Sequence, residues 1–187
     1  MKPYSGFSAE PIKSIEPIPA GGYVAKILKA EVQNNDWGDR LLIAFDIIEG
    51  EHKGHFTEQY NAQSGEDKKW KGMLRLTIPT DENSEKNNWS KRSFNNFIWA
   101  VEDSNPGYHW DWNEAGLKGK TIGVLFRNKE WEMNGRTGWT TECSSATGAD
   151  NIRNGKFNVP KDKPLAKKPE TTGFAPLADD DGDLPWL

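Results

Sequence analysis

The stretch "SKRSFNNFIWAVEDSNPG", Ser90 to Gly107, interrupts a pattern that the chain keeps on both sides of it. Its apolar residues recur at positions i, i+3, i+4 and i+7, which is the spacing of one helical face. They are Phe94, Phe97, Ile98 and Val101. Ser90 is the expected N-cap, and Asn105-Pro106-Gly107 is the expected end of the helix. The sequence therefore predicts one helix in the middle of a chain whose flanks indicate strands.

Strand patterns lie before and after this helix, bounded by turn signals. They cover residues 22–32, 40–48, 70–78, 121–126, 129–133 and 139–143. A short strand or bulge is also expected at 56–60, and "NGRTG" (Asn134 to Gly138) is a strong hairpin signal. With the patterns at 121–126 and 129–133 taken as one strand, five strands with a helix after the third predict a mainly β fold, a five-stranded Greek-key barrel of the oligonucleotide-binding (OB) kind. A mixed α+β sandwich is the main rival.

Three segments are expected along the chain. Residues 1–19 contain Pro11, Pro17 and Pro19 and predict an extended lead-in, and residues 20–160 hold the barrel. Residues 161–187 are rich in Pro, Lys, Ala and Thr, a composition that predicts a disordered linker ending in a functional tip.

The charge is distributed unevenly. The 187 residues carry a net charge of −4, but five of the 28 acids follow residue 169 while all 24 bases precede it. Residues 1–169 are therefore close to neutral, and the acidity belongs to the tail. Cys143 is the single cysteine, Met1 to Lys13 lacks a signal-peptide pattern, and no apolar run could span a bilayer. These features predict a soluble protein of a reducing cytoplasm.

Signatures of enzymes are weak in this sequence, so we expect no enzyme, metal or cofactor. His52 and His55 are three residues apart but lie in a Gly-flanked turn, and we expect two solvated loop histidines. No stretch has the Lys and the spacing of a phosphate loop. Cys143 has no evident His partner and is expected to be buried on a strand.

Two clusters interleave aromatic rings with cations, as a groove for single-stranded nucleic acid requires. The first contains Tyr60, Lys68, Lys69, Trp70, Lys71 and Arg75, and the second contains Phe126, Arg127, Lys129, Trp131, Arg136 and Trp139. Trp37, at the tip of the turn "NNDWGD", is a further candidate.

Strand periodicity predicts which residues of these clusters share a face. Alternation along a strand puts Lys71 and Arg75 on one face with Met73. Trp131 and Trp139 are equidistant from Gly135, so we expect them to lie opposite each other across the hairpin. The remaining tryptophans near the helix are assigned elsewhere: Trp99 to the core, and Trp110 and Trp112 to packing.

The end of the chain, "DDDGDLPWL", combines clustered acids with an apolar terminus. It resembles the acidic tip of bacterial single-stranded DNA-binding proteins. The body, with "PAGGYVAKILKAEV", "DKKWKG" and "NPGYHWDW", is similar to the single-stranded DNA-binding proteins of phages and conjugative elements of Gram-positive bacteria.

The resemblance implies sequence-independent binding and protection of single-stranded DNA, in the cytoplasm of a bacterial host, with self-association left open. It also implies a tip that recruits replication, recombination or repair proteins. On this chain the tip residues are Asp179, Asp180, Asp181, Asp183, Leu184, Pro185, Trp186 and Leu187. The family's tip usually stops at the aromatic residue, whereas here Leu187 follows Trp186.

Three other functions are less favoured than single-stranded DNA binding, and a nuclease is the least favoured of them. A DNA mimic that blocks a restriction or defence enzyme of the host needs carboxylates spread over the folded body. An annealing protein also binds single strands, and a nuclease would cleave them.

Overall fold

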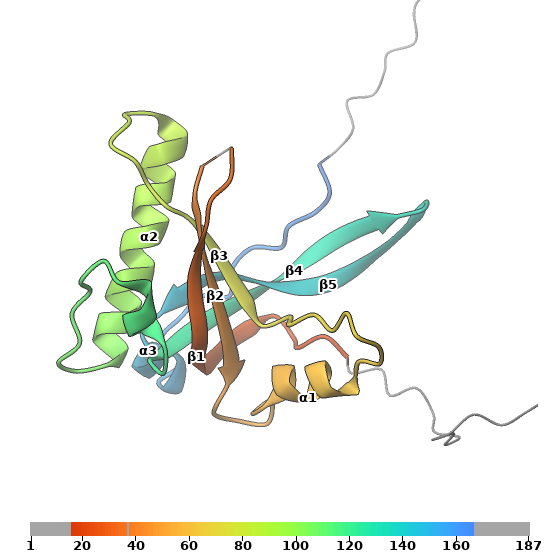
Figure 1. Cartoon of the computed structure of the whole chain (residues 1–187). Coiled ribbons are helices and arrows are strands. Elements are labelled where there is room, and N and C mark those ends of the chain that lie inside the picture. Colours follow the sequence, from red (N-terminus) through yellow and green to blue (C-terminus); the bar gives the residue numbers. More distant parts are fainter. Residues whose placement is uncertain (1–15, 37, 167–187) are drawn as a thin grey trace, which may run out of the picture.

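Five antiparallel strands form one sheet in the order β3-β2-β1-β4-β5, in a computed structural model that describes residues 16–36 and 38–166 (Figure 1). The strands are β1 (Gly21–Gln33), β2 (Arg40–Ile47), β3 (Met73–Thr77), β4 (Thr121–Met133) and β5 (Arg136–Thr147). Three α-helices and one 3-10 helix accompany them: α1 (His55–Ala62), α2 (Glu85–Ser104), η1 (Glu114–Leu117) and α3 (Ala149–Arg153). The edge strands β3 and β5 also contact one another. The mainly β class is therefore confirmed.

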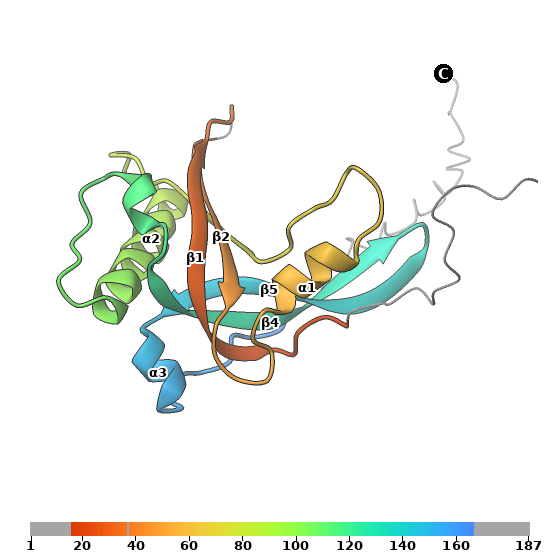
Figure 2. The same cartoon turned by 60° about the horizontal axis from the view of Figure 1, so that its bottom comes forward.

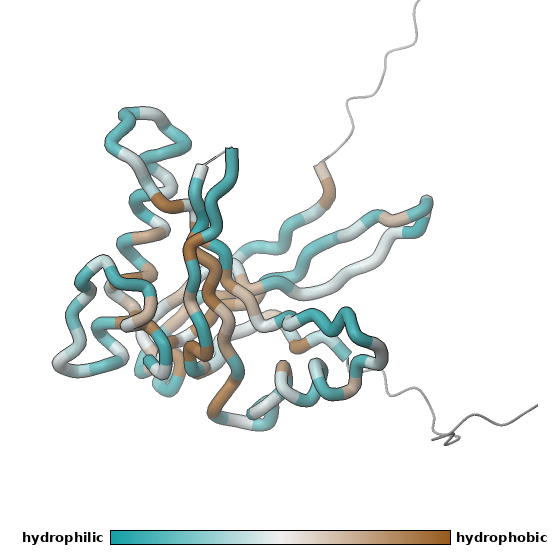
Figure 3. The backbone as a smooth tube through the Cα atoms, viewed as in Figure 1, coloured by the Kyte–Doolittle hydropathy of each residue, from teal (hydrophilic) through white to brown (hydrophobic). Residues whose placement is uncertain are grey.

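The core lies where α2 packs across the sheet, and apolar residues gather there in Figure 3. Phe94, Phe97 and Val101 of the predicted helical face are all buried. They meet a strand layer that includes the fully buried Ile27 and Phe45. Because burial of one such side chain contributes about 1.5–3 kcal/mol, this shared face accounts for the position of α2.

The start of α2 was predicted wrongly. The helix begins at Glu85, and its N-cap is Ser84, whose hydroxyl accepts a hydrogen bond from the Asn87 amide at 3.2 Å. Ser90 is instead buried inside the helix, where its hydroxyl donates to the Lys86 carbonyl. The first turn has no apolar periodicity. It is held instead by a polar contact, since the Asn87 side chain bonds the backbone of Thr80. Hydrophobic spacing could not reveal such a turn.

The segment at 56–60 is also different from the prediction, since it belongs to helix α1 rather than to a strand or bulge. Its N-cap, Gly54, offers no side chain. The buried carboxylate of Asp46, at the end of β2, caps the helix instead by accepting the amides of Phe56 at 3.0 Å and Thr57 at 3.1 Å. A cap supplied from another element leaves no local signature in the sequence.

Strands β4 and β5 extend beyond the sheet as a two-stranded arm, seen in Figures 1 and 2. β1 pairs with β4 only up to Phe126, whereas β4 and β5 remain paired as far as Met133 and Arg136. Asn134 and Gly135 form the turn with φ values of 52° and 73°, as a tight hairpin requires. The hairpin prediction is confirmed.

The ends of the described chain pack against this framework. Ile18, in the predicted lead-in, is buried, and its carbonyl accepts a hydrogen bond from the Thr141 hydroxyl. Lys163 pairs in parallel with Lys129, and its backbone bonds Asn128 and Glu130 of β4. Disorder was predicted from residue 161, but residues 161–165 instead follow the edge of the arm. Within the described residues, no helix combines the length and apolar character needed to cross a bilayer.

Candidate nucleic-acid interface

A groove of about 630 Å³ opens between α1, the segment before β3, and the base of the β4–β5 arm. We call it the cationic groove. The charged side chains that line it are Lys69, Lys71, Arg75, Arg127, Lys129 and Glu142. Five cations against one carboxylate make this surface strongly positive, although the chain as a whole has a net charge of −4. Both predicted clusters contribute to it.

Glu142 holds the cations of the arm together. Its carboxylate accepts hydrogen bonds from Arg127 at 2.8 Å and from Lys129 at 2.9 Å, and Lys163 lies 3.8 Å away. Burial raises the pKa of Glu142, but the hydrogen bonds from Lys129 and Arg127 outweigh it and keep the pKa below its usual range. The carboxylate is therefore ionised at neutral pH, and the cations around it exceed its charge.

The opposite wall of the groove is fixed by backbone contacts. Asp46 anchors the start of α1, and Gln63 follows the end of the helix. The Gln63 side-chain amide both accepts from the Lys69 amide and donates to the Lys69 carbonyl, each at 2.8 Å. These two bonds fold the loop between them into a defined shape, so that Lys69 and Lys71 are presented from an ordered segment.

Trp70 is half-buried and oriented by its indole N–H, which donates to the carbonyls of Phe45 at 3.2 Å and Gly72 at 3.0 Å. Gly72 is needed here because a Cβ at this position would lie 2.4 Å from the Phe45 carbonyl oxygen. The Tyr60 ring is 5.8 Å from the Trp70 ring, and the Lys68 ammonium lies 5.5 Å from the Tyr60 centroid. These three residues form an aromatic and basic rim beside the groove.

The arm carries the second cluster, but not with the predicted geometry. Trp131 pairs with Gly138 and Trp139 pairs with Glu130, so the two indoles are on opposite faces of the ribbon. The prediction that they lie opposite each other was wrong, because Asn134-Gly135 is a two-residue turn and not a turn centred on Gly135. Trp131 shares its face with Arg127 and Lys129 and packs closely over Gly138.

Other candidates are placed outside the groove surface. Phe126 is only 3% exposed, and its ring stacks on Phe56 at 6.0 Å, so it forms the floor of the groove and offers no face to a base. Arg136 is exposed at the far end of the arm, beyond the groove lining. Trp37 and all eight tip residues, Asp179 to Asp181 and Asp183 to Leu187, lie outside the described residues.

Sequence reasoning missed several groove residues. Trp89 of α2 lines the groove and is 64% exposed, but setting the helix start at Ser90 left it in a loop. His55 and Gln59 lie one helical turn apart on α1, and both line the groove. The i, i+4 spacing of these two polar residues could have indicated a helix with both on one face, but the segment was predicted to be a strand.

His55 is not the solvated loop residue that was expected. It is buried at the start of α1, and its Nε2 finds no hydrogen-bond partner among residues 16–36 and 38–166. Burial, followed by the proximity of His52, lowers the pKa of His55 below 6.5. The imidazole is therefore neutral at pH 7 and adds no charge to the groove.

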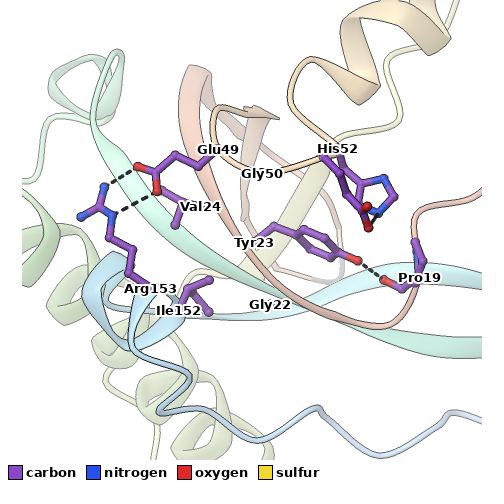
Figure 4. A pocket seen from close by; sticks show the side chains of 10 residues that line it. Pro19, Gly22, Tyr23, Val24, Glu49, Gly50, His52, Ile152 and Arg153 are labelled. Carbon is purple, nitrogen blue, oxygen red and sulfur yellow. Dashed lines mark hydrogen bonds and ion pairs between the residues drawn. The ribbon is translucent and has the colours of Figure 1, made fainter.

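A second pocket of about 410 Å³ lies between β1, the turn after β2 and α3 (Figure 4). Its one arginine, Arg153, points to Glu49 and makes two hydrogen bonds with it, at 2.6 Å and 3.1 Å. Arg153 also bonds Asp150 at 2.7 Å. Because these carboxylates already satisfy the guanidinium, this pocket lacks the excess positive charge that a phosphate backbone needs.

The remaining tryptophans are divided between packing and exposure. Trp110 is half-buried against the core, as predicted. Trp99 is 48% exposed, so its assignment to the core was wrong, and Trp112 is 74% exposed although one face of its ring stacks on Phe94. Trp99 is on the exposed side of α2, whereas Phe97 and Val101 on the other side of the helix belong to the core.

Two further observations concern Cys143 and metal binding. Cys143 is half-buried on β5, and burial raises the pKa of its thiol. In the part of the chain that the structure describes, no group of three or more His, Cys, Asp or Glu is arranged to hold a metal ion.

Comparison with models of known protein families and with curated proteins gives no match to this chain.

Proposed function

We propose that this chain is an OB-fold protein that binds single-stranded DNA without sequence preference, protects it, and recruits replication, recombination or repair proteins through its acidic tip. The observation that carries the proposal is the convergence on one groove of five cations, the exposed Trp89 and the half-buried Trp70. Phosphates of a single strand need the cations, and unpaired bases need flat rings. Neither requirement involves the identity of the bases.

The topology supports the fold part of the proposal. An OB-fold is a five-stranded, partly open Greek-key barrel whose β1–β2 and β4–β5 loops contact oligonucleotides. Here the helix α2 lies between β3 and β4, and the edge strands β3 and β5 contact each other. The β1–β2 hairpin and the β4–β5 arm both project from the sheet in Figures 1 and 2.

A titration with a fluorescein-labelled dT oligonucleotide tests the proposal. We expect saturable binding whose log–log dependence on salt has a slope near −3, since about four phosphates each contribute about −0.7. Tryptophan emission should be quenched by poly-dT, and duplex DNA of the same length should have little effect. A flat salt response, or emission unchanged by poly-dT at low ionic strength, would contradict the proposal.

The tip has a second expected effect, because its acids are complementary to the cationic groove. Removing residues 177–187 should tighten binding of dT at low salt, and the difference should disappear at high salt as the charges are screened. Weaker binding by the truncated chain would mean that the tip does not compete with DNA.

Competing functions give different outcomes in simple assays. A DNA mimic would not bind dT, a nuclease would cleave it in the presence of magnesium, and an annealing protein would accelerate pairing of complementary strands. The excess of cations in the groove argues against a mimic, since a mimic presents carboxylates where DNA presents phosphates.

A further inference from the structure

A shallow aromatic trough of about 260 Å³ lies on the outer side of α2, and it has no place in the function proposed above. The residues that line it are Phe94, Asn95, Ile98, Trp99, Glu102, Trp110 and Trp112. In Figures 1 and 2 the helix α2 and the free end of the β4–β5 arm lie on opposite sides of β1 and β2, and none of the residues that line the trough belongs to the arm.

The trough exposes far more apolar surface than packing requires. Trp99 and Trp112 are 48% and 74% exposed. The Trp112 indole stacks on Phe94 at 6.1 Å with an interplanar angle of 14°, and Trp110 lies 6.2 Å from Trp112 at 57°. Phe94 and Trp112 are therefore stacked with Trp110 tilted beside them, and exposed aromatic rings grouped in this way are typical of partner-binding surfaces.

Two unfavourable features are retained in this trough. Trp112 has a φ of 65°, a left-handed conformation that a bulky side chain adopts at a cost. The Nε1 of Trp110 is buried and finds no acceptor among residues 16–36 and 38–166. A strained tryptophan beside an indole donor without an acceptor indicates a surface that is completed by a ligand with carbonyl groups, such as a peptide backbone.

The charge of the trough identifies the class of ligand. Glu102 is its one charged lining residue among the described part of the chain. Its Oε1 accepts the Trp110 amide at 2.8 Å, which holds the carboxylate beside the rings. Stacked indoles next to a carboxylate favour a cation, and a guanidinium satisfies both because it stacks on rings and pairs with carboxylates.

We propose that this trough binds an arginine-bearing apolar peptide segment of a partner protein. The same charge disfavours nucleic acid, whose phosphates Glu102 repels, and it disfavours the acidic tip of the chain itself. This inference does not depend on the DNA-binding proposal, because the groove and the trough share no lining residue.

The indole N–H signals of the full-length protein provide the test, because its nine tryptophans give at most nine peaks in an uncrowded region of the ¹H–¹⁵N spectrum. Single Trp→Phe variants assign the peaks. The probes are the peptide Ac-Arg-Leu-Arg-Leu-NH2, its acidic counterpart Ac-Glu-Leu-Glu-Leu-NH2, and a dT oligonucleotide. The arginine peptide should shift the peaks of Trp99, Trp110 and Trp112, the acidic peptide should shift none, and dT should shift a different set.

Two exposed tryptophans on the same helix provide matched variants. Trp99→Ala should weaken binding of the arginine peptide about fivefold or more and leave dT binding unchanged. Trp89→Ala, which changes the groove end of α2, should do the reverse. Absence of dT binding by the parent protein, with binding of the arginine peptide intact, would overturn the DNA proposal alone.

Three results would overturn the trough proposal. In the first, the arginine peptide shifts no trough indole peak at millimolar concentration. In the second, the acidic peptide shifts the same peaks as much as the arginine peptide does. In the third, dT shifts the trough peaks of the Trp89→Ala variant. Sedimentation adds a fourth, since a dimer that Trp99→Ala converts to a monomer would mean that a second copy of the chain covers the trough.

Discussion

The cationic groove and the aromatic trough are both rich in tryptophan, yet they differ in the charges that surround the rings. The groove places Trp70 and Trp89 among five cations, whereas the trough places Trp99, Trp110 and Trp112 beside Glu102. We therefore expect rings of the same type to bind different ligands. The comparison teaches that the charges beside an exposed tryptophan indicate the class of partner to expect, whereas the number of tryptophans does not.

The largest effect is expected when the cations of the groove are removed. Lys71 and Arg75 are both exposed, and the double variant Lys71→Ala, Arg75→Ala should bind dT about tenfold to a hundredfold more weakly at low salt. The salt slope should become shallower by about 1.4, for two lost contacts. Fluorescence anisotropy at several salt concentrations measures both quantities.

The matched control removes two exposed cations elsewhere. Lys118 follows η1 and Lys156 follows α3, and the variant Lys118→Ala, Lys156→Ala changes the net charge by the same amount. We expect its affinity for dT to remain within about twofold of the parent. Equal losses in both variants would show that binding depends on net charge alone and would remove the distinction between groove and trough.

A second prediction divides the two tryptophans of the arm. Trp131 shares a face with Arg127 and Lys129, so Trp131→Ala should cost about 1–3 kcal/mol of dT binding, the contribution of one stacked base. Trp139 is on the other face, and Trp139→Ala should cost less. Titration of both variants with the same oligonucleotide measures the two losses of affinity. A larger loss for Trp139→Ala would mean that DNA follows the opposite face of the arm.

A third prediction concerns the wall of the groove. Asp46→Asn replaces one of the two buried acceptor oxygens at the start of α1 with an NH2 donor and should lower the free energy of unfolding by about 2 kcal/mol. Faster amide exchange should be confined to α1 and its surroundings, with α2 and the trough unaffected. Glu58→Gln, an exposed acid in the same first turn, is the control. Uniform loss of protection across both regions would contradict a local role for this cap.

The smallest effect is expected from pH, again at the groove. Because the pKa of His55 is lowered by burial and by His52, the unfolded chain binds more protons than the folded chain below about pH 6.5. The free energy of unfolding should therefore fall as the pH decreases from 6.5 through the lowered pKa of the folded state. Denaturant unfolding of His55→Gln should show a weaker dependence, and His109→Gln, which changes an exposed histidine, should behave as the parent. A parent protein whose stability is constant over this range would contradict the buried neutral imidazole.

Much of the fold could be predicted from periodicity. The helical face of Phe94, Phe97 and Val101 and the turn at Asn134-Gly135 depend on local patterns, and both were recovered. The cap that Asp46 supplies to α1 and the start of α2 at Glu85 depend on contacts between distant or polar residues. No hydrophobic spacing records such contacts, so these two elements were misjudged.

The candidate site could likewise be predicted where it depends on residues close in the sequence, and not where it depends on tertiary contacts. Clustering of bases with aromatic residues identified the cations that line the groove, because residues close in the sequence remain close in space. The floor and the far wall came from Phe56, Gln59 and Trp89, which join the groove only through the tertiary fold. The faces on which Trp131 and Trp139 lie depend on the type of turn. An error of one residue in the predicted register placed both indoles on the same face of the arm, whereas they lie on opposite faces.

The most direct test of the central claim is the indole region of the ¹H–¹⁵N spectrum during titration of the full-length protein with dT. The account predicts that the signals of Trp70, Trp89 and Trp131 shift while those of Trp99 and Trp112 stay in place. Shifts confined to Trp99 and Trp112, or no shift of any indole at low salt, would contradict it.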